Sequence, residues 1–190
     1  MENLDILERE IRDRRAVFPV MYNSDTISKE ELLNILENAR WAPTHRLTQP
    51  WKFIVFHGDS LKKLSNYLGD YYIQNTPSAT YSDLKYKKTV EKPLKSACVL
   101  AIVLSRDTER RVPEWEEIAA VSIAVQNIWL SCSARGIGAY WSSPESALNA
   151  NEFLSLKENE TCLGLFYMGR RKTNPPAPDR KPVEEFVSFY

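Results

Sequence analysis

A chain of 190 residues, 43% of them hydrophobic, is long enough to bury the core of one domain. Its 25 lysines and arginines balance 25 aspartates and glutamates, which argues against a nucleic-acid partner and against a membrane-surface protein. Any anion-binding site must therefore arise from a local cluster of charges.

Cysteine usage and the start of the chain indicate the compartment. Cys98, Cys132 and Cys162 are widely spaced, odd in number and set in apolar runs, which predicts reduced, buried thiols rather than a disulfide framework. The charged first fifteen residues lack the apolar core of a signal peptide, and no apolar run approaches the roughly 18 residues of a membrane span. We therefore expect a cytoplasmic protein with no membrane association.

The first third of the chain carries two helix signals and one strand signal. Apolar residues at helical spacing predict a helix over the first dozen residues, ending at Arg14 and Arg15. Ser28 opens a capping box before a second helix, which Pro43 would stop. After the polar loop APTHRLTQP, residues 51–57 (WKFIVFH) read as a strand.

The middle of the chain predicts a core strand and a long apolar helix. A helix is expected from residue 60 to about 73, and the polar, tyrosine-rich stretch 74–93 is expected to be a mobile excursion with a short helix, suited to a lid. Residues 97–104 (ACVLAIVL) are apolar throughout, which predicts a strand covered on both faces. Pro113 begins a helix that is apolar on all sides, as in a central helix or a subunit interface.

The last third predicts two strands separated by a helix. Strand signals cover residues 139–143 and 161–168, with a helix near 146–156 between them. Prolines then forbid regular structure, yet the chain closes on the apolar sequence EFVSFY. We expect this ending to pack on a partner subunit.

Several common site motifs are missing. His45 and His57 have 11 residues between them and no clustered cysteine or carboxylate, so no ordinary metal site is predicted. The serine pair at 142–143 lacks the G-x-S-x-G of a hydrolase. The glycines of Gly136-Ile137-Gly138 follow a helix and precede a strand, the reverse of a dinucleotide-binding motif, and are expected to end the helix.

Two features remain as site candidates. Arg14 and Arg15 could bind a phosphate in bidentate fashion, although by charge pattern alone a solvated pair at a helix end is the commoner case. Trp41 and Trp141 each adjoin a polar loop and are candidates to wall a planar ligand, whereas the other tryptophans suit ordinary packing.

Four blocks of the sequence resemble the nitroreductase family of flavin enzymes, in particular its short bacterial members. They are DRRAV (13–17), WAPTHRLTQPWKFIVF (41–56), VPEWEEIAAVSIAVQNIWLSCSARGIGAYWSS (112–143), and LGLFYMG (163–169) together with the FVSFY ending. The QPW block and the long helix followed by G-x-G-x-x-W are specific for this family when they occur together.

The resemblance implies a fold and an assembly. The fold would be an α+β sandwich with a mainly antiparallel central sheet flanked by helices, in an intertwined homodimer. Residues 1–190 would form a single domain, with 172–190 as a C-terminal extension that packs on the partner subunit. The apolar helix after Pro113 and the apolar ending predict a dimer by a separate route.

The resemblance also implies an FMN site at the dimer interface. Arg14 and Arg15 match the basic pair that holds the phosphate and ribityl chain, and Ala16, where many relatives have serine, would offer only its backbone N–H. The remaining matched positions are Trp41 and His45, reaching the flavin from the partner, and Trp141, Ser142 and Ser143 beside the ring and ribityl chain.

Two further positions bear on this site. Many relatives carry asparagine at the position of Leu47, so one polar contact is expected to be missing. Arg170, Arg171 and Lys172 follow the last strand where longer relatives place a phosphate contact, and they are weaker candidates.

The implied activity is hydride transfer from NADH or NADPH to FMN and then to a small-molecule acceptor, such as a nitroaromatic or a quinone, in a ping-pong mechanism. No catalytic residue is assigned, since solvent or His45 could supply protons. Two alternatives remain: a flavin enzyme with a dedicated non-nitro substrate, and a non-enzymatic flavin-binding protein.

Overall fold

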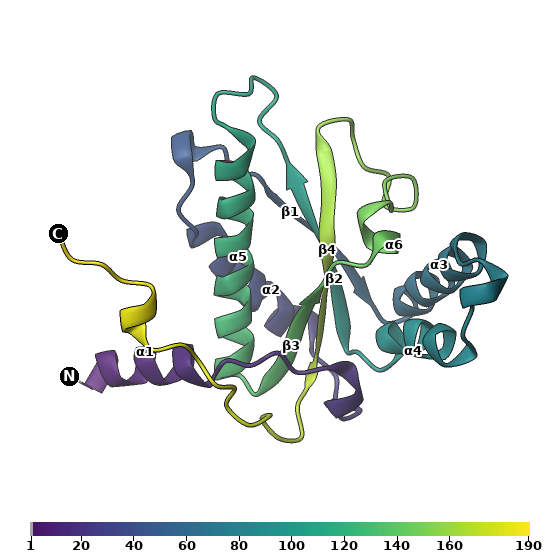
Figure 1. Ribbon diagram of the computed structural model, residues 1–190, viewed down its shortest axis with the longest axis horizontal. Helices are drawn as coiled ribbons and strands as arrows, with labels where there is room; N and C mark the ends of the chain where they lie inside the picture. The colour runs from purple at the N-terminus through teal and green to yellow at the C-terminus, as the bar shows by residue number, and fades with distance from the viewer. Residues whose placement is uncertain (1) are drawn as a thin grey trace.

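The computed structural model describes residues 2–190, leaving Met1 outside, and its centre is a four-stranded antiparallel sheet (Figure 1). The strand order is β1-β2-β4-β3, and the strands are β1 (Trp51–His57), β2 (Cys98–Ser105), β3 (Ile137–Ser142) and β4 (Glu160–Arg170). Each strand runs antiparallel to its neighbours, so the expected α+β class with a mainly antiparallel sheet is confirmed.

Strand β2 lies inside the sheet and is buried on both faces, as its unbroken apolar sequence predicted. Its residues 98–104 are all buried, with Leu100 and Ile102 in one cluster and Val99 and Ala101 in the other. Because successive side chains of a strand point to opposite faces, a strand with no polar position requires a layer on each side.

Helices supply these two layers (Figure 1). One face of the sheet is covered by α2 (Lys29–Glu37) and α5 (Glu114–Ala134), and the other by α3 (Ser60–Asn75) with the short α6 (Glu145–Leu148). Helix α4 (Asp83–Leu94) packs on α3, and α1 (Glu2–Asp13) extends from the body of the protein beside α5.

The second helix begins at Ser28, as predicted. The Ser28 hydroxyl accepts a hydrogen bond from the Glu31 backbone N–H at 3.1 Å, which supplies one half of a capping box. The other half is replaced by a distant contact, because the Glu31 carboxylate accepts from Arg170 at 2.6 Å. After α2, a 3₁₀ turn (Asn38–Trp41) brings the chain to Pro43.

Helix α5 begins directly after Pro113 and ends where the glycines were expected to end it. Gly136 adopts the left-handed backbone conformation (φ 68°) just beyond the helix, which costs a glycine little. By length and composition alone α5 is apolar enough to cross a membrane, contrary to the sequence expectation. Its buried residues instead pack against the sheet, which accounts for the apolar composition.

Two segments differ from their sequence expectations. The stretch 74–93 is mostly the twelve-residue helix α4, longer than the short helix expected, and the approach to α3 is so close that a Cβ on Gly69 would lie 2.8 Å from Val90. The helix expected at 146–156 is only α6, because the chain leaves helical geometry at Asn149, a residue type that favours helix ends over interiors. Turns continue to Ser155.

All three cysteines are free and buried, as predicted. Burial raises the pKa of the Cys98 thiol to about 12 and also raises the pKa of Cys132 and Cys162. A thiol reacts as its thiolate, so these cysteines are structural at neutral pH.

Candidate functional site

The site is built along the open edge of strand β3. Residues just after α1 pair with this edge through one rung, an Ala16–Ala139 bridge in which the Val17 N–H donates to the Ala139 carbonyl at 3.0 Å. The next rung would join the Val17 carbonyl to the Trp141 N–H, but the Tyr22 hydroxyl donates to that carbonyl at 2.8 Å instead. Pairing therefore stops after Ala139.

This interruption leaves backbone donors unused. Antiparallel strands direct alternate residues to alternate edges, so Trp141, like Ala139, turns its N–H away from β4. Within the described residues no protein group accepts from the Ala16 N–H either. The Trp141 N–H thus points out of the open edge of β3, and the Ala16 N–H points outward from the far side of the segment that pairs with Ala139. A ligand with acceptor oxygens could use either donor.

Arg14 and Arg15 lie beside this edge, anchored to α5 by one tryptophan. The Arg14 guanidinium carbon lies 4.5 Å from the centre of the Trp129 ring, and the Trp129 indole N–H donates to the Arg15 carbonyl at 3.1 Å. Both arginines are half-buried rather than solvated. Burial lowers the pKa of Arg14, and the charges of Arg180 and Arg15 lower it further.

The same arginines line a basic pocket of about 450 Å³. Its lining residues are Ile11, Arg12, Asp13, Arg14, Arg15, Ala177, Pro178 and Arg180. The Arg15 Nε is buried and has no hydrogen-bond partner among the described residues. A buried guanidinium N–H without a partner, among several like charges, fits an anionic ligand such as a phosphate.

Trp141 is fixed at the far end of the edge. Its indole N–H donates to the Leu163 carbonyl at 3.0 Å, and a Cβ on Gly164 would lie 2.5 Å from that indole nitrogen. Gly164 also has φ 135°, so glycine is needed there on both counts. Ser142 and Ser143 follow directly, half-exposed and exposed respectively, and Ser142 is the last residue of β3.

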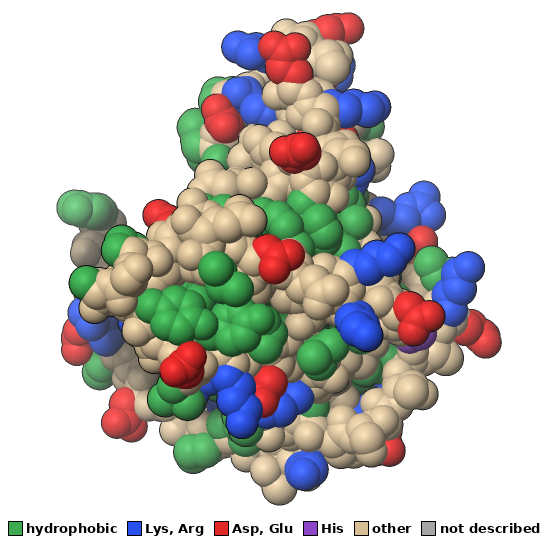
Figure 2. Space-filling model, turned by 90° about the vertical axis from the view of Figure 1, so that its right-hand side faces the viewer, with side chains coloured by type: hydrophobic (Ala, Val, Ile, Leu, Met, Phe, Trp, Pro, Cys, Tyr) green, Lys and Arg blue, Asp and Glu red, His purple; other side chains and the backbone are tan. Residues whose placement is uncertain are grey.

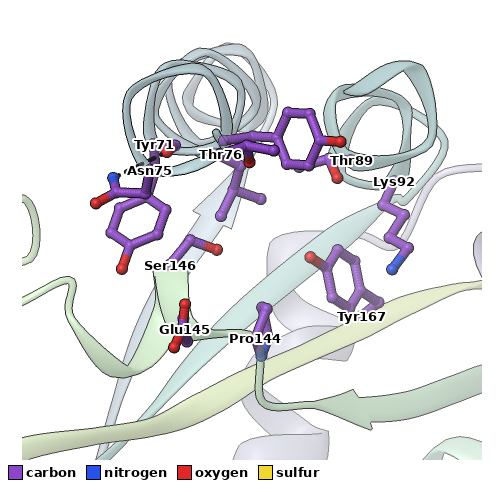
Figure 3. Close-up of a pocket in the computed structure, with 11 residues that line it drawn as sticks. Tyr71, Asn75, Thr76, Thr89, Lys92, Pro144, Glu145, Ser146 and Tyr167 are labelled. Carbon is purple, nitrogen blue, oxygen red and sulfur yellow. Dashed lines mark hydrogen bonds between the residues drawn. The ribbon is translucent and has the colours of Figure 1, made fainter. Parts of the chain in front are cut away.

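The residues that follow Ser143 line a second pocket, of about 270 Å³, shown in Figure 3. Pro144, Glu145 and Ser146 face α3 and α4 across it, with Tyr167 of β4 at its base. Lys92 reaches this pocket from α4, and burial, with Lys88 adding, lowers its pKa. The sequence did not predict this pocket, because the polar stretch that forms α4 has no clear helical period.

Trp41 and His45 lie elsewhere in the same chain. His45 Nδ1 is 2.5 Å from a carboxylate oxygen of Glu116, in the first turn of α5, whereas Arg14 contacts Trp129 near the other end of that helix. The two places are roughly 20 Å apart along α5 at about 1.5 Å per residue. Trp41 is 74% exposed. Within one chain, His45 therefore lies far from the Arg14–Arg15 pair, and the Trp41 side chain is turned mainly to solvent.

The basic residues at the end of β4 are mainly engaged in the fold, and Arg170, expected after the last strand, is the final residue of β4. Arg170 donates to Glu31 at 2.6 Å and to the Arg135 carbonyl at 3.0 Å, and Arg171 donates to the Ser133 carbonyl at 3.4 Å. These contacts join the end of β4 to α2 and α5. Across residues 2–190 no three metal-ligating side chains are grouped together.

The loop that carries His45 is strained. Arg46, Leu47 and Gln49 all have left-handed backbone angles, with φ 52°, 54° and 46°. Such angles cost a residue with a Cβ about 1–2 kcal/mol, and asparagine tolerates them better than leucine. Leu47 thus occupies a backbone conformation that asparagine would adopt at lower cost.

We expect Leu47→Asn to stabilise the protein by about 0.5–1 kcal/mol, because the leucine is 78% exposed and its removal sacrifices little packing. The midpoint of urea unfolding measures this effect. Leu33→Asn is the matched control, since Leu33 is 56% exposed in helix α2 and should lose stability on the same change. Equal losses in the two variants would contradict the strain argument.

Comparison with known proteins gives a consistent result. The model of the nitroreductase family matches residues 11–170. YdjA of Escherichia coli (strain K12) is 27% identical over 168 residues, covering 85% of this chain and 87% of YdjA.

Solved structures share the fold. A nitroreductase-like family protein from Bacillus cereus superposes with a TM-score of 0.81 at 22% identity, covering 97% of this chain and 95% of the other. The FMN-dependent nitroreductase NfnB from Mycobacterium smegmatis, solved in complex with NADPH, has a TM-score of 0.79 at 19% identity, with 98% and 99% covered.

Proposed function

This chain belongs to the nitroreductase family, and on that premise we propose that it is an FMN-dependent oxidoreductase that passes reducing equivalents from NADH or NADPH to small electrophiles. The observation that carries the proposal is the half-buried Arg14–Arg15 pair, docked on Trp129 beside an unpaired sheet edge. The FMN and NADPH named for NfnB support this choice of cofactor and donor.

The residues along this site suit each part of FMN, from its phosphate to its ring. Arg14, Arg15 and the unpartnered Arg15 Nε would hold the phosphate, in a pocket already rich in arginine. The backbone N–H groups of Ala16 and Trp141, both directed away from the sheet, would serve acceptor oxygens of the cofactor. From Ala139 to the end of β3 at Ser142 the strand spans roughly 10 Å at about 3.3 Å per residue, which gives a ribityl chain and ring an edge to lie along.

When bound, FMN would supply the hydride chemistry. The residues of this chain would bind the cofactor, orient it and shield it from water. The arginines neutralise the phosphate, and backbone donors near the ring favour a negative charge that develops there. The pocket beyond Ser143 gives an acceptor a walled place next to that edge. We assign no side chain as a general acid, and protons come from solvent or from His45. Nitroaromatics and quinones suit such a site, in ping-pong alternation with the nicotinamide.

We also propose that the protein is a cytoplasmic homodimer of a single domain, with 172–190 as an extension on the partner. Apolar side chains of three segments are exposed in the isolated chain: Leu4, Leu7 and Ile11 of α1, Trp115 and Ile118 of α5, and Phe186 and Phe189 of the tail. Their exposure supports a second copy as the covering partner. In that dimer Trp41 and His45 would reach the partner's site rather than their own.

Deleting residues 183–190 should weaken the dimer, because the deletion removes exposed apolar side chains of which Phe189 is 97% exposed. Sedimentation velocity on dilution measures the change, and we expect monomer to appear at a protein concentration at least tenfold higher than in the full chain. Lys181→Ala, which removes an exposed charge and its pair with Glu185 but no apolar side chain, is the control. A truncated dimer as resistant to dilution as the full chain would show that the tail does not cross over.

The first test of the function is an absorbance spectrum from about 300 to 550 nm, repeated without oxygen after NADH and then NADPH are added. We expect flavin bands that bleach with at least one donor. Bands that resist both donors would favour the non-enzymatic alternative, and a colourless protein that takes up no FMN would overturn the cofactor assignment. A dedicated non-nitro substrate would show itself as a kcat/KM far above that of any nitro compound.

A further inference from the structure

A third hollow, of about 610 Å³, lies between α4 and the 3₁₀ turn Pro19–Met21. Its lining residues are Phe18, Pro19, Val20, Leu84, Lys87, Lys88, Glu91, Lys92 and Lys95. The volume falls within the range of roughly 300–1,000 Å³ typical of small-molecule pockets. Apart from Lys92, none of these residues lines the two pockets assigned to the flavin and its acceptor.

The floor of this hollow is apolar and exposed. Phe18 is 51%, Val20 75% and Leu84 62% exposed, although all three are large apolar side chains. The Phe18 ring is held in place by Tyr140 of β3, with ring centres 4.8 Å apart. A fixed aromatic ring with one open face offers a stacking surface to another ring.

The rim of the hollow is positively charged. Four lysines surround one acid, Glu91, which is already bound by Lys95 at 2.7 Å and approached by Lys87 at 3.8 Å. Lys88 and Lys92 make no ion pair within the described part of the chain. They are four positions apart on α4, a spacing at which like charges destabilise a helix. An anion between them would remove that repulsion.

Lys92 connects this hollow with the pocket of Figure 3, because it lines both. It is half-buried, so part of its solvation has already been lost and its charge lacks a counterion. Figure 2, which faces the α3–α4 side of the molecule, shows apolar patches and basic side chains lying next to one another in the lower half of the view. Apolar surface and positive charge thus occur together.

We propose that the hollow between α4 and residues 18–20 binds an aromatic carboxylate, with its ring on Phe18 and its carboxylate between Lys88 and Lys92. A bare anion would leave the apolar floor unused, and a neutral aromatic would leave the lysines unpaired. If the ligand is also an electron acceptor, Lys92 places it next to the pocket beyond Ser143, and this last step rests on the proposed function.

Binding can be tested in the oxidised protein, with no nicotinamide present. The probes are 4-nitrobenzoate, its neutral counterpart 4-nitrobenzamide, and acetate, each followed by equilibrium dialysis at low salt. We expect 4-nitrobenzoate to bind at least tenfold more tightly than either of the others, and its advantage over the amide to shrink as salt is raised. Equal affinity for the acid and the amide, or for nitrobenzoate and acetate, would overturn the proposal.

The variant Lys88→Gln/Lys92→Met keeps the side-chain lengths similar and removes both charges. It should bring the ratio of acid to amide affinity close to one, while Lys62→Gln/Lys63→Gln, on the exposed side of α3, should leave that ratio unchanged. An unchanged ratio in the first variant, with circular dichroism showing native folding, would also overturn the proposal. Flavin content and bleaching are measured separately, so failure here is distinguishable from failure of the oxidoreductase assignment.

Discussion

Replacing Arg14 and Arg15 together with alanine should strip FMN from the protein while leaving the fold intact. Each arginine offers charge-assisted hydrogen bonds to a phosphate, at about 1.5–3 kcal/mol for each residue. Losing both weakens FMN binding by roughly two to four orders of magnitude. The fold should tolerate the change because both side chains are only half-buried. Arg14 contributes mainly its stacking on Trp129, and Arg15 contributes local hydrogen bonds to the carbonyls of Arg12 and Arg14.

The measurement is the ratio of flavin to protein after gel filtration, followed by FMN titration of the stripped protein. Lys62→Ala/Lys63→Ala removes the same formal charge from α3 and controls for a nonspecific electrostatic effect. Arg14→Lys/Arg15→Lys should give intermediate affinity, since it keeps the charge and loses the planar fork. Unchanged flavin content in the alanine variant would refute the phosphate assignment.

Arg106→Ala should be among the most destabilising single changes, at about 3–5 kcal/mol. Glu117 in α5 is only 1% exposed, and its carboxylate accepts from Arg106 Nε at 3.0 Å and from the Asp107 N–H at 3.0 Å. Without Arg106 the carboxylate stays in the interior with one neutral donor. A buried charge that has lost its partner costs more than the pair itself contributes.

Chemical unfolding at neutral pH measures the loss. The double variant Arg106→Ala/Glu117→Ala should be more stable than Arg106→Ala alone, because it removes the stranded charge together with its partner. Arg40→Ala breaks the solvent-exposed pair with Glu37 and should leave the unfolding midpoint nearly unchanged. A double variant less stable than Arg106→Ala would show that packing, rather than the buried charge, dominates.

Local patterns in the sequence were enough to place most of the elements. The unbroken apolar run at 97–104 required a two-sided strand, Ser28 capped a helix, and Gly136 ended one. Each of these features depends on residues close together in the chain, where periodicity and capping act directly. The shortened α6 and the longer α4 show the limit of prediction from local patterns. Both have a weak apolar period, and their bounds depend on packing and on single polar residues.

By itself, the sequence determined the central strand through its apolar run. Through its motif blocks it determined the family, with the α+β class that the family implies, and the Arg14–Arg15 pair as a phosphate candidate. Only the tertiary structure decided that Trp129 anchors that pair, that Tyr22 interrupts the pairing of β3, and that Lys92 lies between two pockets. These contacts join residues that are distant in the chain or belong to packed helices. No local period encodes them, because they depend on how separately formed elements meet.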